Sequence, residues 1–569
     1  MKFDLRKTSF RCLFILMLCL IIVEAQPLFS ATPAEPESPW LKAVREFGDQ
    51  ILAKGRDVYG KEHTPLFIDG LNINTLEPVR WLYRNNQWII SNQASQQNLF
   101  RTLTALSNLT GDPKYKNAAK EAIDYMFKNY RSANGLLYWG GHTFIDLESD
   151  TRAYGFDANS HELKNHFPFY DLMWEVDPEA TELYLQAVWN AHVIDWSTLD
   201  MNRHGSWSKS MGRLWKHNFT DPEPFFEGDG LTFINAGTDL IYAAAMLYHY
   251  TGDPDALTWS KRLAYQYVKA RHPETKLGVY QYSKPTRKEI PPPNFTDFKY
   301  TNSKYGDRAE NQLSPEFGSI AKEGYLILPD KAENIYAHNG LIQLQLAELL
   351  GEEGREFLDW THEGLVAYAK HAYIPESNRL RPLWADGTDL TGFVLPRNGY
   401  YGEAGTVFTA KKANSLFFYT YAYAFRLIDD LELWKVARHI ALGHDLGDLG
   451  TLPGQAVKVN LYTKNSDPIA LLGILNLYQA YKEPAYLELA TVIGQNIIKT
   501  KYRNKFFLES PSRVNARFSA LEPLALLALE AAYRNTPELV PPYNGGEGYI
   551  HGQFNGVGRT YDTRVIWSR

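Results

Sequence analysis

The sequence predicts an all-α protein whose helical hairpins close into a toroid, and three observations support this fold class. The tetrapeptide Thr-Gly-Asp-Pro occurs at residues 110–113 and again at 251–254, each time between two segments with helical apolar periodicity. In this tetrapeptide the glycine can end one helix, while the aspartate and proline can begin the next. The hydrophobic fraction is 44%, which is enough for a large core. Long polar inserts interrupt the hairpins, so the chain lacks the fixed period of an open solenoid.

The hairpins follow one another along the chain. The first is a helix over residues 99–109, the turn at 110–113 and a helix over 114–130, and the second is its counterpart over 240–250 and 255–271. In each, Asp112 or Asp253 can cap the second helix. Further hairpins are expected at about 339–371, 414–442, 468–500 and 517–534. Together they predict a toroid, or incomplete barrel, of six or seven hairpins.

Four inserts without helical periodicity separate these hairpins. Inserts of such length usually build binding sites. We therefore expect the two Thr-Gly-Asp-Pro turns on one rim and the inserts on the other, where they form a cleft. The inserts cover residues 131–167, 200–235, 272–336 and 373–413.

The N-terminus has the pattern of a secretory signal. Residues 12–23 are apolar and too short to span a bilayer, and a cleavage site follows at Ala25. We expect a signal peptide over 1–25, a Pro- and Glu-rich linker over 26–38 and one catalytic domain over 39–569, with a periplasmic or secreted location and no membrane contact after cleavage. A lipoprotein site at Cys19 and a retained anchor are the alternatives. The basic residues of the signal are Lys2, Arg6, Lys7 and Arg11.

Cysteine usage and charge exclude several kinds of site. Both cysteines, Cys12 and Cys19, lie within the predicted signal, so the remaining chain has no disulfide and no thiolate metal site. The formal net charge is −6, and nothing in the sequence suggests a nucleic-acid partner. A polyanionic substrate would require a locally basic cleft.

Candidate catalytic residues occur in and beside the first two inserts. His142 follows a Gly-Gly pair, Glu162 lies in the string His-Glu-Leu-Lys, and Arg203-His204 is expected just after a helix that ends near Leu199. Two imidazoles and one carboxylate can bind a divalent cation and leave coordination positions open. An arginine beside one ligand places a cation against whatever the metal binds, which suits a carboxylated substrate.

The order and spacing of these four residues resemble the family-two polysaccharide lyases, which are pectate lyases. The resemblance implies a toroid of seven hairpins and a pectate or oligogalacturonide substrate. It implies His142, Glu162 and His204 as ligands of a divalent metal, with Mn²⁺ as the expected ion, and Arg203 as the catalytic base. His161 competes with His142 as a ligand.

β-Elimination from a 4-linked uronate requires that the C6 carboxylate is neutralised, that a base takes the C5 proton, and that the C4 oxygen is stabilised. A metal ion can neutralise the carboxylate as a Lewis acid. Arginine is an unusual base because its pKa exceeds about 12, but a metal and a desolvated site would both lower it. Lys164, Lys209 and Tyr170 are alternatives for the base.

Other residues near the motif are candidates for substrate binding. Lys164, Lys209 and Arg213 could bind uronate carboxylates, and on a helix Lys209, Arg213 and Lys216 would share one face. Trp139 and Trp207 flank the motif and could stack on sugars, although core packing is the alternative for each.

Two rival functions use the same features. A glycoside hydrolase on a six-hairpin toroid would use a pair of carboxylates, and a glycan-capture protein would bind oligouronides without turnover. A hydrolase would leave no unsaturated product, and a capture protein would tolerate loss of Arg203. The candidate carboxylates are Asp146, Asp150, Glu227 and Asp229.

Overall fold

The computed structural model describes residues 37–83, 86–154, 160–284, 308–552 and 560–568. The predicted signal peptide and all but the end of the predicted linker lie outside these residues. Among the described helices, none is both long and apolar enough to cross a membrane.

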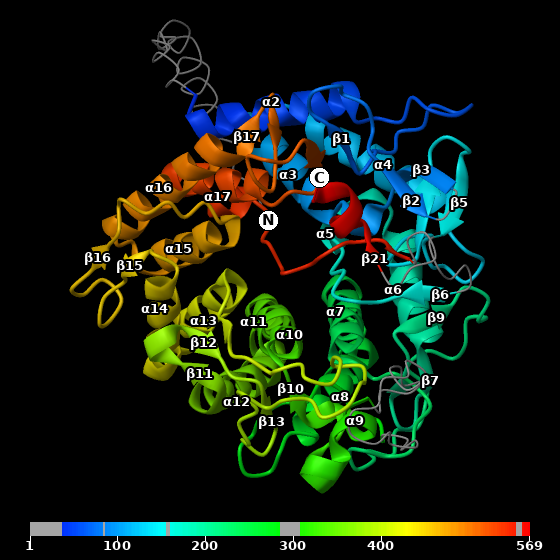
Figure 1. Ribbon diagram of the computed structural model, residues 1–569. Coiled ribbons are helices and arrows are strands. Elements are labelled where there is room, and N and C mark those ends of the chain that lie inside the picture. The colour runs from blue at the N-terminus through cyan, green and yellow to red at the C-terminus, as the bar shows by residue number, and fades with distance from the viewer. Residues whose placement is uncertain (1–36, 84–85, 155–159, 285–307, 553–559, 569) are drawn as a thin grey trace, which may run out of the picture. The chain divides into compact units, whose positions relative to one another are not determined.

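Residues Trp40–Arg569 form one compact unit in which the helices follow one another around a ring (Figure 1). The prediction of a mainly helical protein is confirmed. The helices are α2 (Pro39–Lys54), α3 (Gln97–Thr110), α4 (Lys114–Asn129), α5 (Tyr170–Val176), α6 (Pro178–His192), α7 (Ile234–Thr251), α8 (Pro254–Lys269), α9 (Arg308–Phe317), α10 (Pro329–Ala332), α11 (Asn339–Leu350), α12 (Arg355–Ala372), α13 (Ser415–Ile428), α14 (Leu431–Gly443), α15 (Pro468–Tyr481), α16 (Pro484–Lys501) and α17 (Glu522–Arg534).

Consecutive helices pair as hairpins: α3 packs on α4, α7 on α8, α11 on α12, α13 on α14, and α15 on α16. The first helix of each later pair also packs on the first helix of the next, from α7 through α11, α13 and α15 to α17. Helix α17 then packs on α3, where Arg534 Nη1 donates a hydrogen bond of 2.8 Å to the Leu109 carbonyl. These first helices are buried on nearly all sides and form one continuous hydrophobic core.

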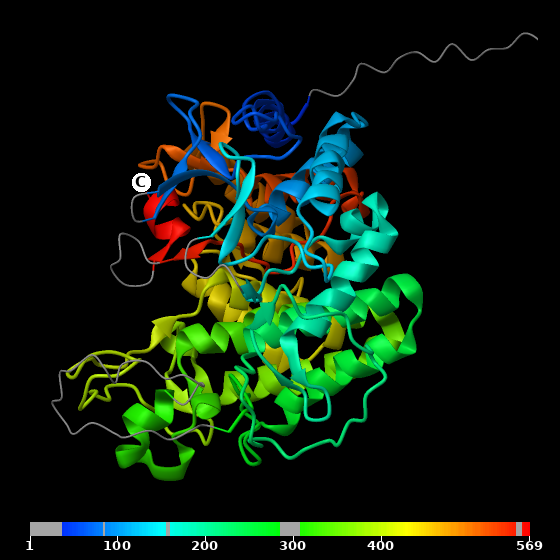
Figure 2. The same cartoon turned by 90° about the vertical axis from the view of Figure 1, so that its right-hand side faces the viewer.

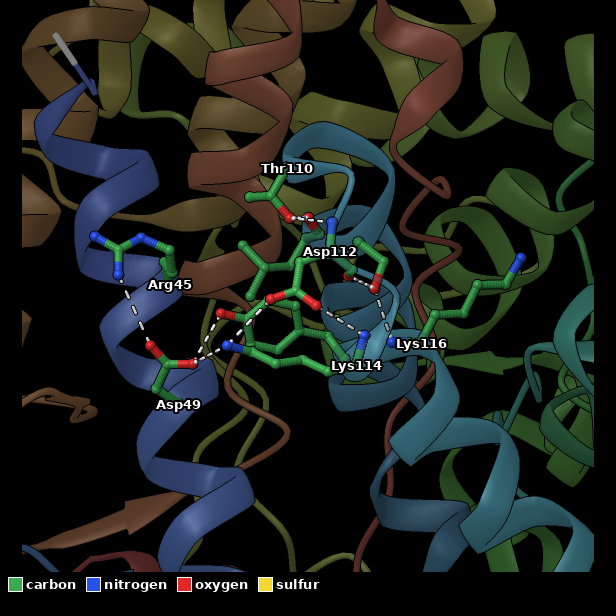
Figure 3. A network of polar contacts seen from close by, with 9 residues as sticks. Arg45, Asp49, Thr110, Asp112, Lys114 and Lys116 are labelled. Atoms are coloured by element: carbon green, nitrogen blue, oxygen red, sulfur yellow. Dashed lines mark hydrogen bonds and ion pairs between the residues drawn. The ribbon is translucent and has the colours of Figure 1, made fainter.

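The two Thr-Gly-Asp-Pro turns have the expected local structure. Gly111 and Gly252 adopt left-handed φ angles of 73° and 72°, and each N–H closes the preceding helix. Asp253 then accepts a hydrogen bond from the Asp255 N–H and caps α8. Figure 3 shows the first turn, where Asp112 accepts from the Lys114 N–H at 3.1 Å and Lys114 Nζ also reaches Asp49 of α2.

Short strands lie in the segments that connect the helices and at the C-terminus. They form a four-stranded sheet in the order β2-β3-β4-β5, a three-stranded sheet β11-β12-β14 and several pairs. The pairs that matter for the site are β6 with β9 and β20 with β21. The strands are β1 (Gly70–Asn72), β2 (Arg80–Tyr83), β3 (Asn86–Ser91), β4 (Thr143–Asp146), β5 (Thr151–Tyr154), β6 (Ser160–Glu162), β7 (Val193–Asp195), β8 (Asp200–Met201), β9 (His204–Ser206), β10 (Leu326–Ile327), β11 (Tyr373–Ile374), β12 (Arg379–Leu380), β13 (Leu383–Trp384), β14 (Lys411–Lys412), β15 (Gly447–Asp448), β16 (Lys458–Val459), β17 (Tyr502–Arg503), β18 (Phe506–Phe507), β19 (Asn515–Arg517), β20 (His551–Gly552) and β21 (Thr560–Tyr561).

The structure corrects two sequence-based expectations and shows the conformation of the segment that carries Lys209, Arg213 and Lys216. The helix before Arg203 ends at His192, because the chain turns there into the β7–β8 hairpin. Residues 517–534 contribute the single helix α17 rather than a hairpin. Residues 209–216 form no helix: the Asn190 side chain binds their backbone, donating to the Lys209 and Ser210 carbonyls and accepting from the Gly212 N–H.

Candidate active site

The β6–β9 pair carries Glu162 and His204 as direct cross-strand partners. Successive residues of a strand point to opposite faces, so Glu162 and His161 separate to the two sides of this ribbon. A further backbone hydrogen bond of 2.9 Å, from the Leu163 N–H to the Arg203 carbonyl, extends the pairing of the two strands. Arg203 and His204 thus lie beside Glu162 with fixed backbone positions.

His142 approaches Glu162 from the start of β4. Its Nε2 lies 3.3 Å from Glu162 Oε2. The preceding Gly141 makes this approach possible, because a Cβ atom there would lie 2.0 Å from the same oxygen. On the other side of the carboxylate, Arg203 Nη2 is 3.4 Å and His204 Nε2 is 3.7 Å from Oε1.

His551 completes the cluster from the far end of the chain. It lies on β20, where its N–H donates to the Gly141 carbonyl at 2.6 Å, and its ring centroid is 4.9 Å from that of His142. The ligand atoms of His142, Glu162 and His551 all lie within 4.8 Å of one another. Nothing in the sequence marks His551 among the 15 histidines, since no local spacing links it to the motif.

Electrostatics at the cluster favour an ionised carboxylate. Burial alone would raise the pKa of Glu162, but His142, Arg203 and His204 outweigh it and hold the pKa well below its usual range. Burial lowers the pKa of His142, against the opposing effect of Glu162. His142 is therefore neutral near pH 7 and can offer a lone pair to a metal.

This donor set fits a divalent cation. Glu162 is 1% exposed and its Oε2 accepts no hydrogen bond, so the buried oxygen can serve a metal. Two or three imidazoles with one carboxylate are ligands typical of Zn²⁺, Mn²⁺ or Fe²⁺ sites. The buried His142, Glu162 and His551 group could hold such an ion, with His204 at its edge.

The structure places His142, rather than its competitor His161, beside Glu162. His161 is fully buried on the opposite face of β6, where its Nδ1 lies 2.8 Å from Nε2 of His192. Its ring packs edge-on against Trp207. His161 therefore does not face the predicted metal site.

Arg203 is held in a pocket of aromatic rings beside the carboxylate. Its side chain is 13% exposed, and its guanidinium lies 5.6 Å from the centre of the Phe233 ring. Burial would lower the pKa of Arg203, but Glu162 and nearby tyrosines raise it overall. In the absence of another cation at Glu162, Arg203 is thus firmly protonated.

A cavity of about 1250 Å³ opens next to the cluster. Lys164 lines it, with its Nζ 3.3 Å from the Tyr561 hydroxyl and 4.6 Å from the centre of the Tyr549 ring. Tyr400 lines it too, and the Arg308 guanidinium stacks 3.7 Å from its ring centre. Arg308 also lies 5.8 Å from the Phe233 ring centre, so Phe233 links it to Arg203. The sequence did not single out Arg308.

Two of the predicted substrate-binding cations lie away from this cavity. Lys209 Nζ donates to the Val193 carbonyl at 2.6 Å, and burial lowers its pKa. Arg213 is exposed on the irregular segment after it. Neither belongs to the described lining of the cavity, so of the three predicted cations only Lys164 lines it.

The two predicted stacking tryptophans are packed in the core. Trp139 is 2% exposed and its Nε1 donates to the Tyr184 hydroxyl at 3.0 Å. Trp207 is 8% exposed between the rings of Tyr138 and His161. The expectation that they stack on sugars is therefore corrected, because neither ring offers an open face.

Two of the rival catalytic carboxylates, and Tyr170 among the alternative bases, have structural partners. Asp150 accepts from the N–H groups of Lys61 and Glu62, and Glu227 pairs with Lys284. Tyr170 is buried against Tyr184 and Tyr242. Burial raises its pKa well above the usual value, and these neighbouring tyrosines raise it further. These contacts explain each residue without a catalytic role.

Comparisons with known proteins agree with the motif. The family described as periplasmic pectate lyase matches residues 64–553. The pectate disaccharide-lyase of Dickeya dadantii (strain 3937) is 36% identical over 542 residues, covering 93% of this chain and 96% of that protein.

Similar solved structures include a D-mannose isomerase (TM-score 0.42, 13% identity, 81% of this chain and 99% of that chain) and the cellobiose 2-epimerase from Bacillus thermoamylovorans B4167 (TM-score 0.40, 12% identity, 87% and 99%). Scores this low assign neither a fold nor a function. The family match spans most of the chain, which confirms the resemblance predicted from the motif: the chain belongs to the periplasmic pectate lyase family and is a polysaccharide lyase.

Proposed function

We propose that this pectate lyase cleaves 4-linked polygalacturonate by β-elimination at Glu162, with a divalent metal and with Arg203 as the base. The observation that carries the proposal is the convergence of His142, Glu162, Arg203 and His204, which lie in two separate inserts, around one buried carboxylate. The family supplies the reaction class.

The metal would be held by His142 and Glu162, with His204 or His551 as the third ligand. When bound, a divalent cation neutralises the substrate carboxylate and so acidifies the C5 proton. Manganese is the ion that the family resemblance implies. It accepts the mixed nitrogen and oxygen ligands present here.

Arg203 would take the C5 proton. Its pKa is raised chiefly by the charge of Glu162. A metal cation bound to Glu162 would cancel the effect of the Glu162 charge on this pKa. The burial of Arg203 would then favour its neutral form, which is the form that can act as a base. Water can protonate the leaving C4 oxygen.

Substrate recognition would rest on Lys164 and Arg308. Both are cations at or beside the cavity, and both lie against tyrosine rings, so a uronate could meet a charge and an aromatic surface together. The name of the Dickeya relative suggests a disaccharide product for this chain as well.

The same proposal includes the organisation of the whole chain. Seven hairpins result if α5 and α6 form one hairpin and α17 pairs with α2. A hydrogen bond of 2.5 Å from Trp40 Nε1 of α2 to Glu530 of α17 supports the second pairing. We propose export to the periplasm or outside the cell, with cleavage after Ala25.

One set of variants tests the function. In His142→Ala and Glu162→Gln we expect loss of bound metal and slow formation of the unsaturated, ultraviolet-absorbing product from polygalacturonate. In Arg203→Lys we expect normal metal content and a turnover about 10² to 10⁴ times lower, because the base is lost.

Lys209→Ala is the matched control, since this cation lies outside the cavity; it should keep both metal and turnover. Excess Mn²⁺ should partly rescue the first pair of variants and not Arg203→Lys. Near-normal turnover in Arg203→Lys, or a product without the unsaturated bond, would overturn the proposal. His204→Ala and His551→Ala then decide which imidazole is the third ligand.

A further inference from the structure

A pair of buried histidines lies directly behind the strand pair that carries the site. His161 of β6 and His192, the last residue of α6, are both 0% exposed. His161 Nδ1 lies 2.8 Å from His192 Nε2, and His192 Nδ1 lies 2.7 Å from the Asn202 carbonyl. Neither ring touches the predicted metal or substrate, so the site chemistry described above does not account for them.

The partners fix the proton positions in this chain of hydrogen bonds. A carbonyl only accepts, so His192 Nδ1 must carry the proton it donates to Asn202. His192 Nε2 then accepts from His161 Nδ1. His192 must be neutral for this, and burial lowers its pKa to about 3; burial also lowers the pKa of His161 well below its usual value.

Each end of this chain is anchored next to a functional residue. His161 precedes Glu162, and Asn202 precedes Arg203. The Asn202 N–H also donates to the His192 carbonyl at 2.9 Å. His192 therefore hydrogen-bonds both the N–H and the carbonyl of Asn202. Asn202 Oδ1 in turn accepts from the His204 N–H at 3.0 Å.

The strand pair needs such support because it is very short. β6 and β9 share only three residue pairs, and a two-stranded ribbon of this size is not stable alone. Gly205, which pairs with His161 across the strands, leaves room for the His192 ring, because a Cβ atom there would lie 2.5 Å from His192 Nε2. The backbone of β9 and the His192 ring are thus in direct contact.

We propose that His161 and His192 are positioning residues that fix Glu162, Arg203 and His204 through the hydrogen-bonded chain from β6 to Asn202. This inference rests on the proposed function for its catalytic consequence, but not for its metal-binding consequence. Partners behind metal ligands typically change metal affinity or activity 10- to 100-fold when removed, roughly the effect expected here.

The test compares His192→Leu with His192→Gln in the full chain. Glutamine can donate to the Asn202 carbonyl and accept from His161, whereas leucine can do neither. We expect His192→Leu to weaken the binding of Mn²⁺ alone, measured by calorimetry, about 10- to 100-fold and to lower kcat similarly, with a smaller change in KM. His192→Gln should recover most of both.

Trp189→Phe is the matched control on the same helix. It removes a buried hydrogen bond from Nε1 to the Leu240 carbonyl and should lower stability without changing Mn²⁺ affinity or kcat. If His192→Leu does not fold, Gly205→Ala displaces the ring instead and is compared with His192→Gln in the same way.

The inference is overturned if a folded His192→Leu or Gly205→Ala keeps wild-type Mn²⁺ affinity and kcat, or if His192→Gln is as impaired as His192→Leu. Failure of the proposed function looks different. In that case wild-type protein makes no unsaturated product, while Mn²⁺ affinity still follows the order wild type, His192→Gln, His192→Leu.

Discussion

Glu162 is the residue around which the site is organised. A buried carboxylate is costly unless cations or hydrogen bonds compensate it. Here His142, Arg203 and His204 surround it and keep it ionised. The same arrangement leaves Oε2 without a hydrogen bond, so this buried oxygen is available to a metal ion.

At the residue scale, Gly141→Ala should disrupt metal binding without touching any ligand. The new methyl carbon would lie 2.0 Å from Glu162 Oε2, so the carboxylate must move away from His142. We expect Mn²⁺ affinity to fall at least about tenfold, as for other changes beside metal ligands, measured by calorimetry.

The control is Gly340→Ala in α11, whose nearest neighbour would be at an ordinary 3.4 Å. It should bind Mn²⁺ like the wild type. Unchanged affinity in Gly141→Ala would show that Oε2 is not a ligand.

The four residues of the motif could be predicted because their order and spacing are a property of the local sequence. His551 could not, because its position depends on the docking of a C-terminal strand against Gly141. The two tryptophans illustrate the reverse error. Aromatic residues beside a motif suit sugar stacking and core packing equally in sequence, and only their burial separates the two.

At the scale of elements, the junction of α6 with β9 makes stability depend on pH. His192 has a folded pKa of about 3, below the value of about 6.5 in an unfolded chain. Below pH 6.5 the unfolded chain takes up a proton that the folded chain refuses, so the free energy of unfolding falls as the pH falls.

For His192 alone this loss is about 1.6 kcal/mol between pH 6.5 and pH 5. His192→Gln, which cannot titrate, should therefore lose that much less stability over this interval. Urea denaturation of both proteins at the two pH values measures the difference. Equal losses would mean that the His192 ring is charged, or accessible to protons, in the folded protein.

The helical hairpins were predictable where their ends carry turn chemistry, as at residues 110–113 and 251–254. Helices α2 and α5 lack that punctuation and were not defined in advance, whereas α6 begins with a capping Asp177 and Pro178 and only its end was misplaced. Lys209, Arg213 and Lys216 would share one face only on a helix, and the segment 209–216 is not helical: Asn190 of α6 hydrogen-bonds its backbone instead.

At the scale of the whole molecule, the negative protein must attract a negative polymer locally. The formal net charge is −6, whereas Lys164 lines the cavity and Arg203 and Arg308 lie near the Phe233 ring. Polygalacturonate binding should weaken roughly tenfold between 50 mM and 500 mM salt, since screening falls mainly on exposed charge pairs.

Fluorescence or calorimetric titration of the inactive Arg203→Lys variant would measure this binding without turnover. Lys164→Ala should bind more weakly and respond less to salt. Binding that is independent of salt would assign recognition to the tyrosines rather than to the cations.

The hydrogen bond between His551 and Gly141 joins positions 410 residues apart in sequence (551 − 141 = 410). Contacts of such separation form late, because a long loop must close before they are gained. Helices and even complete hairpins can therefore exist in a refolding chain that has no functional centre. Recovery of Mn²⁺ binding would then date the docking of the C-terminal strand, whereas circular dichroism would date the earlier growth of helices. The interval between the two signals would measure how long a folded set of helices exists without its functional centre.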